Sequence, residues 1–484
     1  MKSIICIDQG TTSTRVVAFD EELNPLKTSQ KEYSLIFPKD GWVEIDVKIL
    51  QSTVNEALDD VCSSFKEIIS IGITNQRETT ILWNKNNGQP LHNAIVWQDR
   101  RTARYCDQLK AQGVEETINQ KTGLVLDPYF SATKLKWLLD KYDNNRKLSS
   151  NGDLLFGTVE TFLIWKLTGG REHVTDYTNA SRTMLCNLQS QNWDEELLRL
   201  FNIPREVLPD IKTNDAFFGE VEHLHAPIFG AIGDQQSALV GQNCFHSNSM
   251  KATFGTGCFL MVNTGSERIV SKNGILTTAG YQLEGKTAYA LEGSIFSAGT
   301  GIKWLRDNMQ FFQNSEDSEQ LINSNWDSKG VIFIPAFTGV GAPRWQPNLR
   351  AGFYGMTAET SKADLTTSVF KALAFQVREL LISLERDSIS IDKLSVDGGM
   401  TNNAAFCQLL ADICNIEIQV PDYKESTILG AAKCAGIGSG IFSILDLIKN
   451  PNKNSVFTPS KHIGCDEEFG VWANFLDLIS SLEK

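Results

Sequence analysis

The hydrophobic positions of the first eighty residues predict three strands, a helix and a fourth strand. Apolar runs at residues 4–7 and 15–19 flank a glycine-containing turn, which predicts a hairpin. The segment KEYSLIF at residues 31–37 is expected to form the third strand. Residues 47–68 carry apolar side chains at the spacing of one helix face, and IISIGI at residues 68–73 predicts a buried strand.

The second half of the chain has the same order of elements. Residues 250–265 predict a strand, a Gly-Thr-Gly turn and a strand, and residues 281–291 alternate like a hairpin. Ser361 and Asp364 form a capping-box signal before a long helical pattern, which ends before the strand LSVD. The pattern therefore favours one structural unit that occurs twice.

The segment between these units is IFGAIGDQQSALVGQNCF, residues 228–245, which predicts a strand, a tight turn and the start of a helix. We place a domain boundary just after it, giving an N-terminal domain of residues 1–246 and a C-terminal domain of residues 247–484. Two α/β lobes of this size are expected to bind small ligands in the cleft between them.

Composition narrows the possible partners. The formal net charge of −13 argues against nucleic acid or an anionic membrane surface, which both require clustered basic residues. No apolar run approaches the ~20 residues of a membrane helix, and no signal peptide is evident. The ten cysteines are scattered without metal-type or disulfide-type spacing. A cytoplasmic protein without membrane insertion is expected.

Two turns have the composition of a phosphate site. In DQGTTSTR, Gly10 could adopt a positive φ, so that the backbone amides of residues 8–13 form a nest for an anion. The Gly-Thr-Gly turn around Thr256 offers a matching site in the second unit, and Asp8 could hold Mg²⁺. Each turn alone is more often an ordinary hairpin, but the matched pair favours polyphosphate binding.

Other candidate residues have both a structural and a functional interpretation. Asp234 in GDQQ suits a helix N-cap and equally a base that accepts the proton of an attacking hydroxyl. The double glycine of LSVDGGM suits adenosine, or simply precedes a helix capped by Thr401 or Asn402.

The end of the buried strand at residues 68–73 carries a possible polyol site. Arg77 and Glu78 follow this strand and could bind neighbouring hydroxyls, or form a solvated ion pair. Trp97 and Tyr129 could cover the carbon face of such a ligand, although large aromatic residues more often lie in the core.

Several long motifs are more specific than these single features. The stretches GITNQRETT, NAIVWQDRRTA, DPYFSATK, HVTDYTNASRTML, GDQQSALVGQ and VIFIPAFTGVGAP resemble the FGGY family of carbohydrate kinases over nearly the whole chain. The resemblance implies two ribonuclease H-like, actin-type ATPase domains with an interdomain cleft. It further implies ATP-dependent phosphorylation of glycerol to glycerol 3-phosphate, and a homodimer or homotetramer.

The same resemblance assigns roles to individual residues. It implies that Asp234 is the catalytic base and that glycerol is bound by Arg77, Glu78, Trp97, Tyr129, Asp234, Gln235 and Phe259. It implies that ATP is bound by Thr11, Thr12, Ser13, Arg15, Thr256, Gly299, Lys303, Gly399 and Asn403. Asp8 is the implied residue for Mg²⁺.

Three departures from the family pattern leave details open. Lys303 stands where a glutamine is usual, and Ala404 replaces a polar residue beside the adenosine loop. The glycine-rich, arginine-bearing loop that binds fructose 1,6-bisphosphate in bacterial relatives is absent before GDQQ, which predicts weak or absent inhibition by that ligand.

Two alternative functions stay open. The acceptor could be another polyol, dihydroxyacetone or glyceraldehyde. In a different class, the chain could be a non-catalytic nucleotide-binding interaction protein on an actin-like scaffold.

Overall fold

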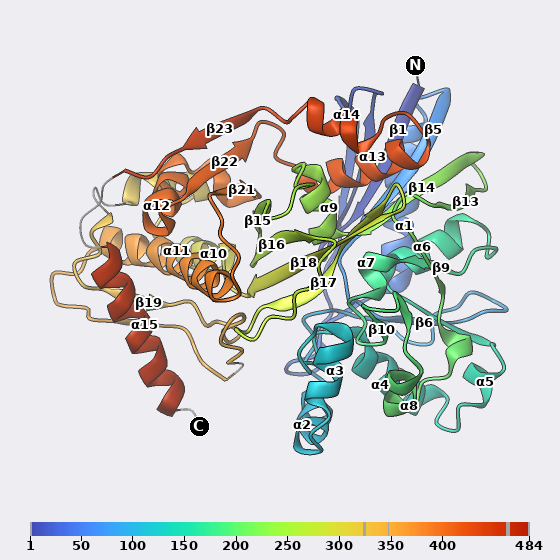
Figure 1. The fold of residues 1–484 in the computed structure, drawn as a ribbon, viewed down its shortest axis with the longest axis horizontal. Coiled ribbons are helices and arrows are strands. Elements are labelled where there is room, and N and C mark those ends of the chain that lie inside the picture. Colours follow the sequence, from blue (N-terminus) through green and yellow to red (C-terminus); the bar gives the residue numbers. More distant parts are fainter. Residues whose placement is uncertain (1, 323–325, 347, 461–464, 483–484) are drawn as a thin grey trace.

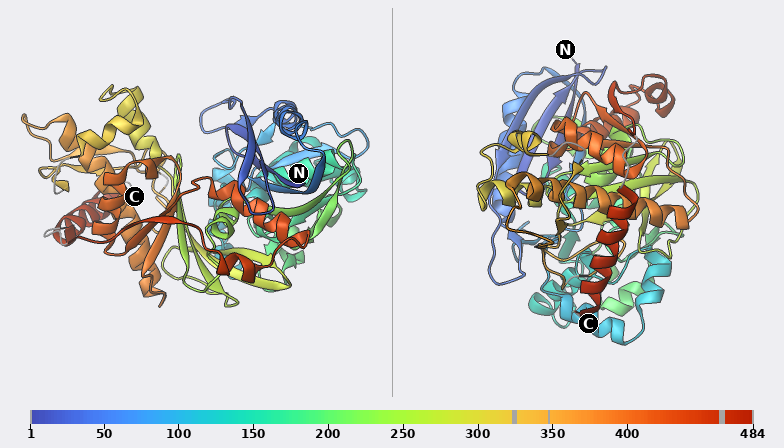
Figure 2. Two further views of the ribbon diagram at one scale, coloured as in Figure 1. Left: turned by 90° about the horizontal axis from the view of Figure 1, so that it is seen from above. Right: turned by 90° about the vertical axis from the view of Figure 1, so that its left-hand side faces the viewer.

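The two halves of the chain form two lobes, which separate clearly in the view from above (Figure 2). The structure, a computed structural model, describes residues 2–322, 326–346, 348–460 and 465–482. Each lobe contains a mixed sheet, with six strands in the first lobe and seven in the second. The predicted α/β organisation is confirmed.

The sheet of the first lobe has the order β13-β14-β5-β1-β2-β3. The strands are β1 (Lys2–Gln9), β2 (Ser13–Phe19), β3 (Pro25–Glu32), β5 (Glu67–Asn75), β13 (Phe217–Val221) and β14 (Ala226–Gly233). Strands β1, β2 and β3 form an antiparallel meander, and β5 and β14 continue the sheet parallel to β1.

The second lobe repeats this arrangement. Its strands are β15 (Met250–Phe254), β16 (Cys258–Gly265), β17 (Leu276–Leu283), β18 (Lys286–Ile295), β21 (Lys393–Asp397), β22 (Glu417–Pro421) and β23 (Asn454–Phe457). Strands β15, β16 and β18 are antiparallel neighbours, while β21 and β22 run parallel to β15. The repeated unit expected from the hydrophobic pattern is therefore present in the topology.

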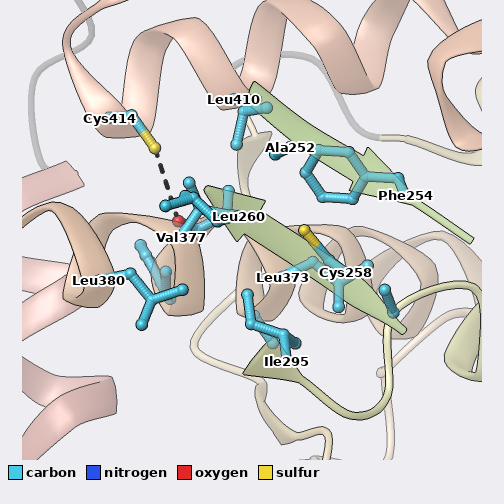
Figure 3. Close-up of a cluster of buried hydrophobic side chains, with 14 of the residues drawn as sticks. Ala252, Phe254, Cys258, Leu260, Ile295, Leu373, Val377, Leu380, Leu410 and Cys414 are labelled. Atoms are coloured by element: carbon cyan, nitrogen blue, oxygen red, sulfur yellow. Dashed lines mark hydrogen bonds between the residues drawn. The ribbon is translucent and has the colours of Figure 1, made fainter. Parts of the chain in front are cut away.

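Helices cover both sheets and build the hydrophobic cores. Helix α1 (Val47–Cys62) begins at Asp46, whose carboxylate caps the amide of Lys48, and α11 (Lys362–Arg386) begins with the predicted capping box of Ser361 and Asp364. In the second lobe, α11 and α12 (Ala404–Cys414) pack against β15, β16 and β18 (Figure 3). The side chains of this contact include Ala252, Phe254, Leu260, Ile295, Val377, Leu380 and Leu410. Each fully buried Leu, Ile or Phe stabilises the fold by about 2 kcal/mol.

Further elements extend this framework. The short strand β4 (Glu44–Ile45) precedes α1 and pairs with β7 (Ala94–Ile95). Between β5 and β13 also lie β6 (Ile81–Asn84), β8 (Leu154–Gly157), α2 (Ala103–Ala111), α3 (Glu115–Thr122), α4 (Ser131–Tyr142), α6 (Val159–Leu167), α7 (Tyr177–Ala180) and α8 (Glu195–Phe201). The second half of the chain adds α10 (Gly299–Asp307), β19 (Ile332–Ile334), β20 (Gly352–Tyr354), α14 (Ile444–Lys449) and α15 (Cys465–Leu482). Among the described residues, no helix is long and apolar enough to cross a membrane.

Two expected elements differ from those observed. The third strand is β3 at Pro25–Glu32 rather than residues 31–37, because it is an edge strand whose alternating exposure tolerates the polar sequence PLKTSQKE. The helix expected over residues 47–68 ends at Cys62. Its last apolar positions instead belong to a turn and to the start of β5, so the helical spacing there was fortuitous.

A helix from the second half of the chain packs on the first lobe. Figure 1 shows α13 (Ser426–Gly438) beside β1 and β5 rather than beside β22. It crosses α9 (Asp234–Gly241) so closely that a Cβ atom on Gly430 would lie 1.8 Å from the carbonyl oxygen of Ser237. A Cβ atom on Gly241 would lie 2.0 Å from the carbonyl oxygen of Ser426. This crossing joins the lobes.

We predict that Gly430→Ala destabilises the protein, because the added methyl group would overlap backbone atoms that cannot move aside independently. Overpacking of this kind costs roughly 1–3 kcal/mol, which urea denaturation will detect as a lower midpoint. Gly470→Ala is the matched control, since a Cβ atom on this glycine of α15 would have no neighbouring atom within 4 Å. Equal stability of the two variants would contradict the close crossing.

Candidate functional site

A cavity of about 340 Å³, called the central cavity here, lies between the two lobes. The β1–β2 turn contributes Thr11 and Thr12 to its lining, and the β15–β16 turn contributes Gly255, Thr256 and Gly257. The two hairpins that the sequence singled out therefore line one space from opposite lobes. Backbone amides and hydroxyl groups in such turns are suitable donors for phosphate oxygens.

The two hairpins are fixed in different ways. The amide of Gly10 donates to the carbonyl of Ser13 at 2.9 Å, and the carbonyl of Gly10 accepts from Nε2 of Gln76 at 2.9 Å. Gly10 does not adopt the positive φ that the sequence suggested. Gly257 is required by close packing, since a Cβ atom there would lie 2.6 Å from the carbonyl oxygen of Ile295. The turns are therefore held by contacts beneath them.

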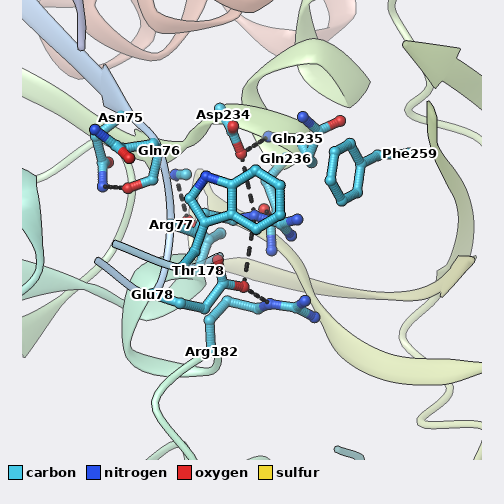
Figure 4. Close-up of polar contacts among 12 residues, drawn as sticks. Asn75, Gln76, Arg77, Glu78, Thr178, Arg182, Asp234, Gln235, Gln236 and Phe259 are labelled. Carbon is cyan, nitrogen blue, oxygen red and sulfur yellow. Dashed lines mark hydrogen bonds and ion pairs between the residues drawn. The ribbon is translucent and has the colours of Figure 1, made fainter. Parts of the chain in front are cut away.

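The central cavity also brings together the seven residues expected to bind the acceptor. Its lining includes Arg77, Glu78, Trp97, Tyr129, Asp234, Gln235 and Phe259. Figure 4 shows that Arg77 lies between the acidic side chains of Glu78 and Asp234, with Phe259 across the cavity. Arg77 and Glu78 follow β5, whereas Asp234 follows the neighbouring parallel strand β14, so the carboxyl ends of adjacent strands bring them together.

Arg77 is the centre of a buried ion network. Its Nε lies 3.1 Å from Oδ1 of Asp234, and its Nη1 and Nη2 donate to the carboxylate of Glu292 at 2.5 and 3.1 Å. Glu292 also accepts from Nη2 of Arg182 at 2.8 Å, and Arg182 donates through Nε to Glu78 at 2.6 Å. Carboxylates and guanidinium groups therefore alternate along the network, in the order Asp234, Arg77, Glu292, Arg182 and Glu78.

The charges in this network determine its protonation. Burial alone would raise the pKa of Glu292, but Arg182 and Arg77 lower that pKa to about 2. Burial also raises the pKa of Asp234, an effect opposed by Arg77 and Lys251. The arginine that contacts Asp234 therefore helps to keep its carboxylate ionised, which a general base requires.

Asp234 is not the N-cap of its helix. Gly233 occupies the cap position, and Asp234 is the first residue of α9. Its Oδ1 accepts from the backbone amide of Gln235 at 2.7 Å, while its side chain remains about a quarter exposed to the cavity. The purely structural interpretation of Asp234 therefore loses its main support.

Aromatic side chains from both lobes form the wall beside this network. Trp97 makes edge-to-face contacts with Tyr129 at 5.7 Å and with Phe259 at 6.0 Å between ring centroids. The indole Nε1 of Trp97 donates to the hydroxyl of Thr11 at 3.0 Å, which connects this wall to the β1–β2 turn. Such faces suit the carbon-bound hydrogens of a small polyol.

A second cavity of about 570 Å³, called the distal cavity, adjoins the central cavity. It contains five of the residues expected to bind ATP: Thr256, Gly299, Lys303, Gly399 and Asn403. Asn403 is also the N-cap of α12, accepting from the amide of Phe406 at 2.8 Å, so neither Thr401 nor Asn402 has that role. Ala404 is the first residue of α12 and does not line the distal cavity.

Two expected nucleotide residues lie outside both cavity linings. Ser13 begins β2, and Arg15 follows it on the same strand. Arg15 donates to Oε1 of Gln30 at 3.1 and 3.0 Å and forms an ion pair with Glu425, at the start of α13. Contact between Arg15 and a phosphate would therefore require this side chain to exchange partners.

Asp8 is compatible with the expected Mg²⁺. It is a partly exposed residue of β1, between the buried residues Ile7 and Gln9, and lies directly opposite Arg15 in the strand pairing. Burial raises the pKa of Asp8 to about 7, which a bound cation would reverse. Among the described residues, no three or more His, Cys, Asp or Glu side chains are grouped so as to hold a metal ion by themselves. Mg²⁺ commonly uses only one or two carboxylates together with substrate phosphates, so the donor set fits.

Three residues of the site were missed by the sequence reasoning. Glu292 follows an apolar stretch of β18, and Arg182 follows α7. Both side chains are fully buried, and a charged residue that is fully buried is almost always part of an ion pair. Lys251 of β15 is fully buried and donates to Oε1 of Gln235 at 2.5 Å. Its signal in the sequence is a lysine between two apolar residues, Met250 and Ala252.

The fold and the site define the class of the protein. Two actin-like lobes, with a cavity between them that is lined by a hydroxyl-rich turn from each lobe and by the carboxylate of Asp234, form the architecture of an ATP-dependent kinase that acts on an alcohol group. The N-terminal domain of the FGGY family of carbohydrate kinases matches residues 3–241, and its C-terminal domain matches residues 250–439. The chain belongs to the FGGY family of carbohydrate kinases.

Individual relatives cover nearly the whole chain. Glycerol kinase of Alkaliphilus metalliredigens is 46% identical over 470 residues, which are 95% of this chain and 94% of the relative. Glycerol kinase of Listeria innocua is 44% identical over 97% of this chain and 94% of the relative. The crystal structure of Plasmodium falciparum glycerol kinase with ADP superimposes with a TM-score of 0.91 at 37% identity, covering 99% of this chain and 98% of that structure.

Proposed function

We propose that this protein phosphorylates glycerol with ATP, forming sn-glycerol 3-phosphate and ADP. The observation that carries the proposal is the central cavity, in which seven expected acceptor residues surround a space that meets both phosphate turns. The similarity to proteins named glycerol kinase, at 44–46% identity over most of the chain, supports the same acceptor.

The polar groups of the cavity match the acceptor. Arg77 offers N–H donors, Glu78 and Asp234 offer acceptors, and the rings of Trp97 and Phe259 offer apolar faces. A three-carbon triol presents hydroxyl groups on one side and carbon-bound hydrogens on the other. Because the carboxylate of Glu292 is already paired with both arginines, the donors of the site are held in place before the acceptor arrives.

The geometry supports in-line transfer of the γ-phosphoryl group. The turns around Thr12 and Thr256 would hold the phosphates, and the acceptor hydroxyl beside Asp234 would attack. Asp234 would accept the hydroxyl proton late in a loose transition state. Positioning by the two lobes supplies most of the rate enhancement in this scheme.

Asp8 is the residue we propose for Mg²⁺, directly or through bound water. A magnesium ion there would supply positive charge for the phosphate oxygens. The remaining expectations from the sequence, which are the homo-oligomer, the cytoplasmic location and the boundary at residue 246, stay predictions.

Glycerol-dependent release of ADP by the purified protein tests the proposal. We expect the highest kcat/KM for glycerol among glycerol, dihydroxyacetone, glyceraldehyde and longer polyols. A higher value for another acceptor would replace glycerol while keeping the enzyme class. If none of these acceptors causes ADP release, the non-catalytic nucleotide-binding alternative is favoured.

We predict that Asp234→Asn lowers kcat by roughly a hundredfold or more, because the variant cannot accept the hydroxyl proton. Glycerol binding, measured by calorimetry, should persist, since the amide keeps the shape of the side chain. Asp46→Asn is the matched control, because Asp46 only caps α1 and asparagine caps equally well. Near-normal turnover of Asp234→Asn would rule out its role as the base.

A further inference from the structure

The central cavity has a second neighbour, a cavity of about 530 Å³ that we call the lateral cavity. The lateral and central cavities share Trp97, Gln98 and Tyr129 as lining residues. The distal and central cavities share a different set, around Thr256 and Lys303, and the distal and lateral cavities share no lining residue. The central cavity, with the expected acceptor residues, therefore adjoins both the distal and the lateral cavity.

Both lobes contribute to the lateral cavity. Phe37 and residues 40–43 of the first lobe contribute to one side, and Phe296, Phe337, Thr338 and Arg350 of the second lobe contribute to the other. The walls are supported from behind: Trp42 contacts Trp137 at 5.5 Å between ring centroids, and the guanidinium of Arg101 lies 3.9 Å above the ring of Trp42. These contacts keep the space open, because the large side chains cannot collapse into it.

The lining of the lateral cavity suits a neutral polyol better than a nucleotide. The lining combines aromatic faces with the amide of Gln98, the hydroxyl of Thr338 and three charged side chains, Asp40, Arg100 and Arg350. The guanidinium of Arg100 is paired with Asp127 at 2.8 Å, and that of Arg350 donates to the carbonyls of Asn348 and Leu349. Neither phosphate turn contributes a residue. Hydroxyl groups can exchange partners along such a surface, whereas a triphosphate would find no cluster of backbone donors.

We propose that the lateral cavity is the passage through which the acceptor enters and leaves, independently of the nucleotide in the distal cavity. This inference rests on the proposed function, since it takes glycerol as the acceptor. With the nucleotide bound, Thr256 and Lys303 are covered on the distal side, but the Trp97–Tyr129 side stays connected to the lateral cavity. The nucleotide therefore does not trap glycerol, and the two substrates bind in either order.

Release of isotope-labelled glycerol tests this passage. The wild-type protein is loaded with labelled glycerol, with or without a saturating non-hydrolysable ATP analogue, and is mixed rapidly with excess unlabelled glycerol. We expect the analogue to slow release by less than about fivefold, because an open path remains. Slowing beyond that factor would overturn the inference, since it would show that the nucleotide closes the exit.

A variant at the rim provides the second measurement. Thr338 is exposed at the lateral cavity, so Thr338→Trp should narrow the passage without altering the central cavity. We expect glycerol association and release to slow together by about fivefold or more, with the Kd values of glycerol and ADP unchanged. Thr338→Ser is the matched control and should keep wild-type rates. Unchanged rates in Thr338→Trp would overturn the inference.

The two proposals fail in different ways. If the wild-type protein neither binds nor phosphorylates glycerol, the proposed function is wrong, and the release experiment has no signal to measure. If it phosphorylates glycerol but the analogue traps labelled glycerol, the proposed function stands and only the lateral passage is excluded.

Discussion

The ion pair between Arg77 and Glu292 is the contact on which the site depends. Arg77 belongs to the first lobe and follows β5, whereas Glu292 belongs to β18 of the second lobe. Both side chains are almost completely buried, and a buried charge is strongly unfavourable unless it is paired. Because the same guanidinium reaches Asp234, the contact between lobes also determines the position and charge of the proposed base.

The short helix α9 connects this network to the junction of the lobes. Asp234 stands at its first residue, and its last residue, Gly241, lies in the crossing with α13. Buried Lys433 of α13 donates to the carbonyl of Gly241 at 2.6 Å, which satisfies the end of α9. A change in the angle between α9 and α13 would therefore act directly on Asp234. The packing of α13 is therefore coupled to the position of the Asp234 carboxylate.

Much of this architecture could be predicted from the sequence, because local signals decided it. The capping box at Ser361, the paired hairpins and the strand before Asp234 all depend on short-range spacing. The edge strand β3 was misplaced because its polar alternation resembles a loop. The positive φ expected at Gly10 was wrong because the turn closes through the Gly10–Ser13 hydrogen bond instead. Glu292 could not be placed, since its partners lie 215 and 110 residues away in the chain.

Glycerol binding to Glu292→Gln tests the central claim most directly. Glutamine keeps the size of the side chain but removes the charge that fixes Arg77, so titration calorimetry should show glycerol affinity reduced by about tenfold or more. The affinity of Glu292→Gln for ADP should be unchanged. Glu379→Gln is the matched control, because Glu379 is paired with Arg344 outside the three cavities, and this variant should bind glycerol normally. Wild-type glycerol affinity in Glu292→Gln would contradict the dependence of the acceptor site on this ion pair.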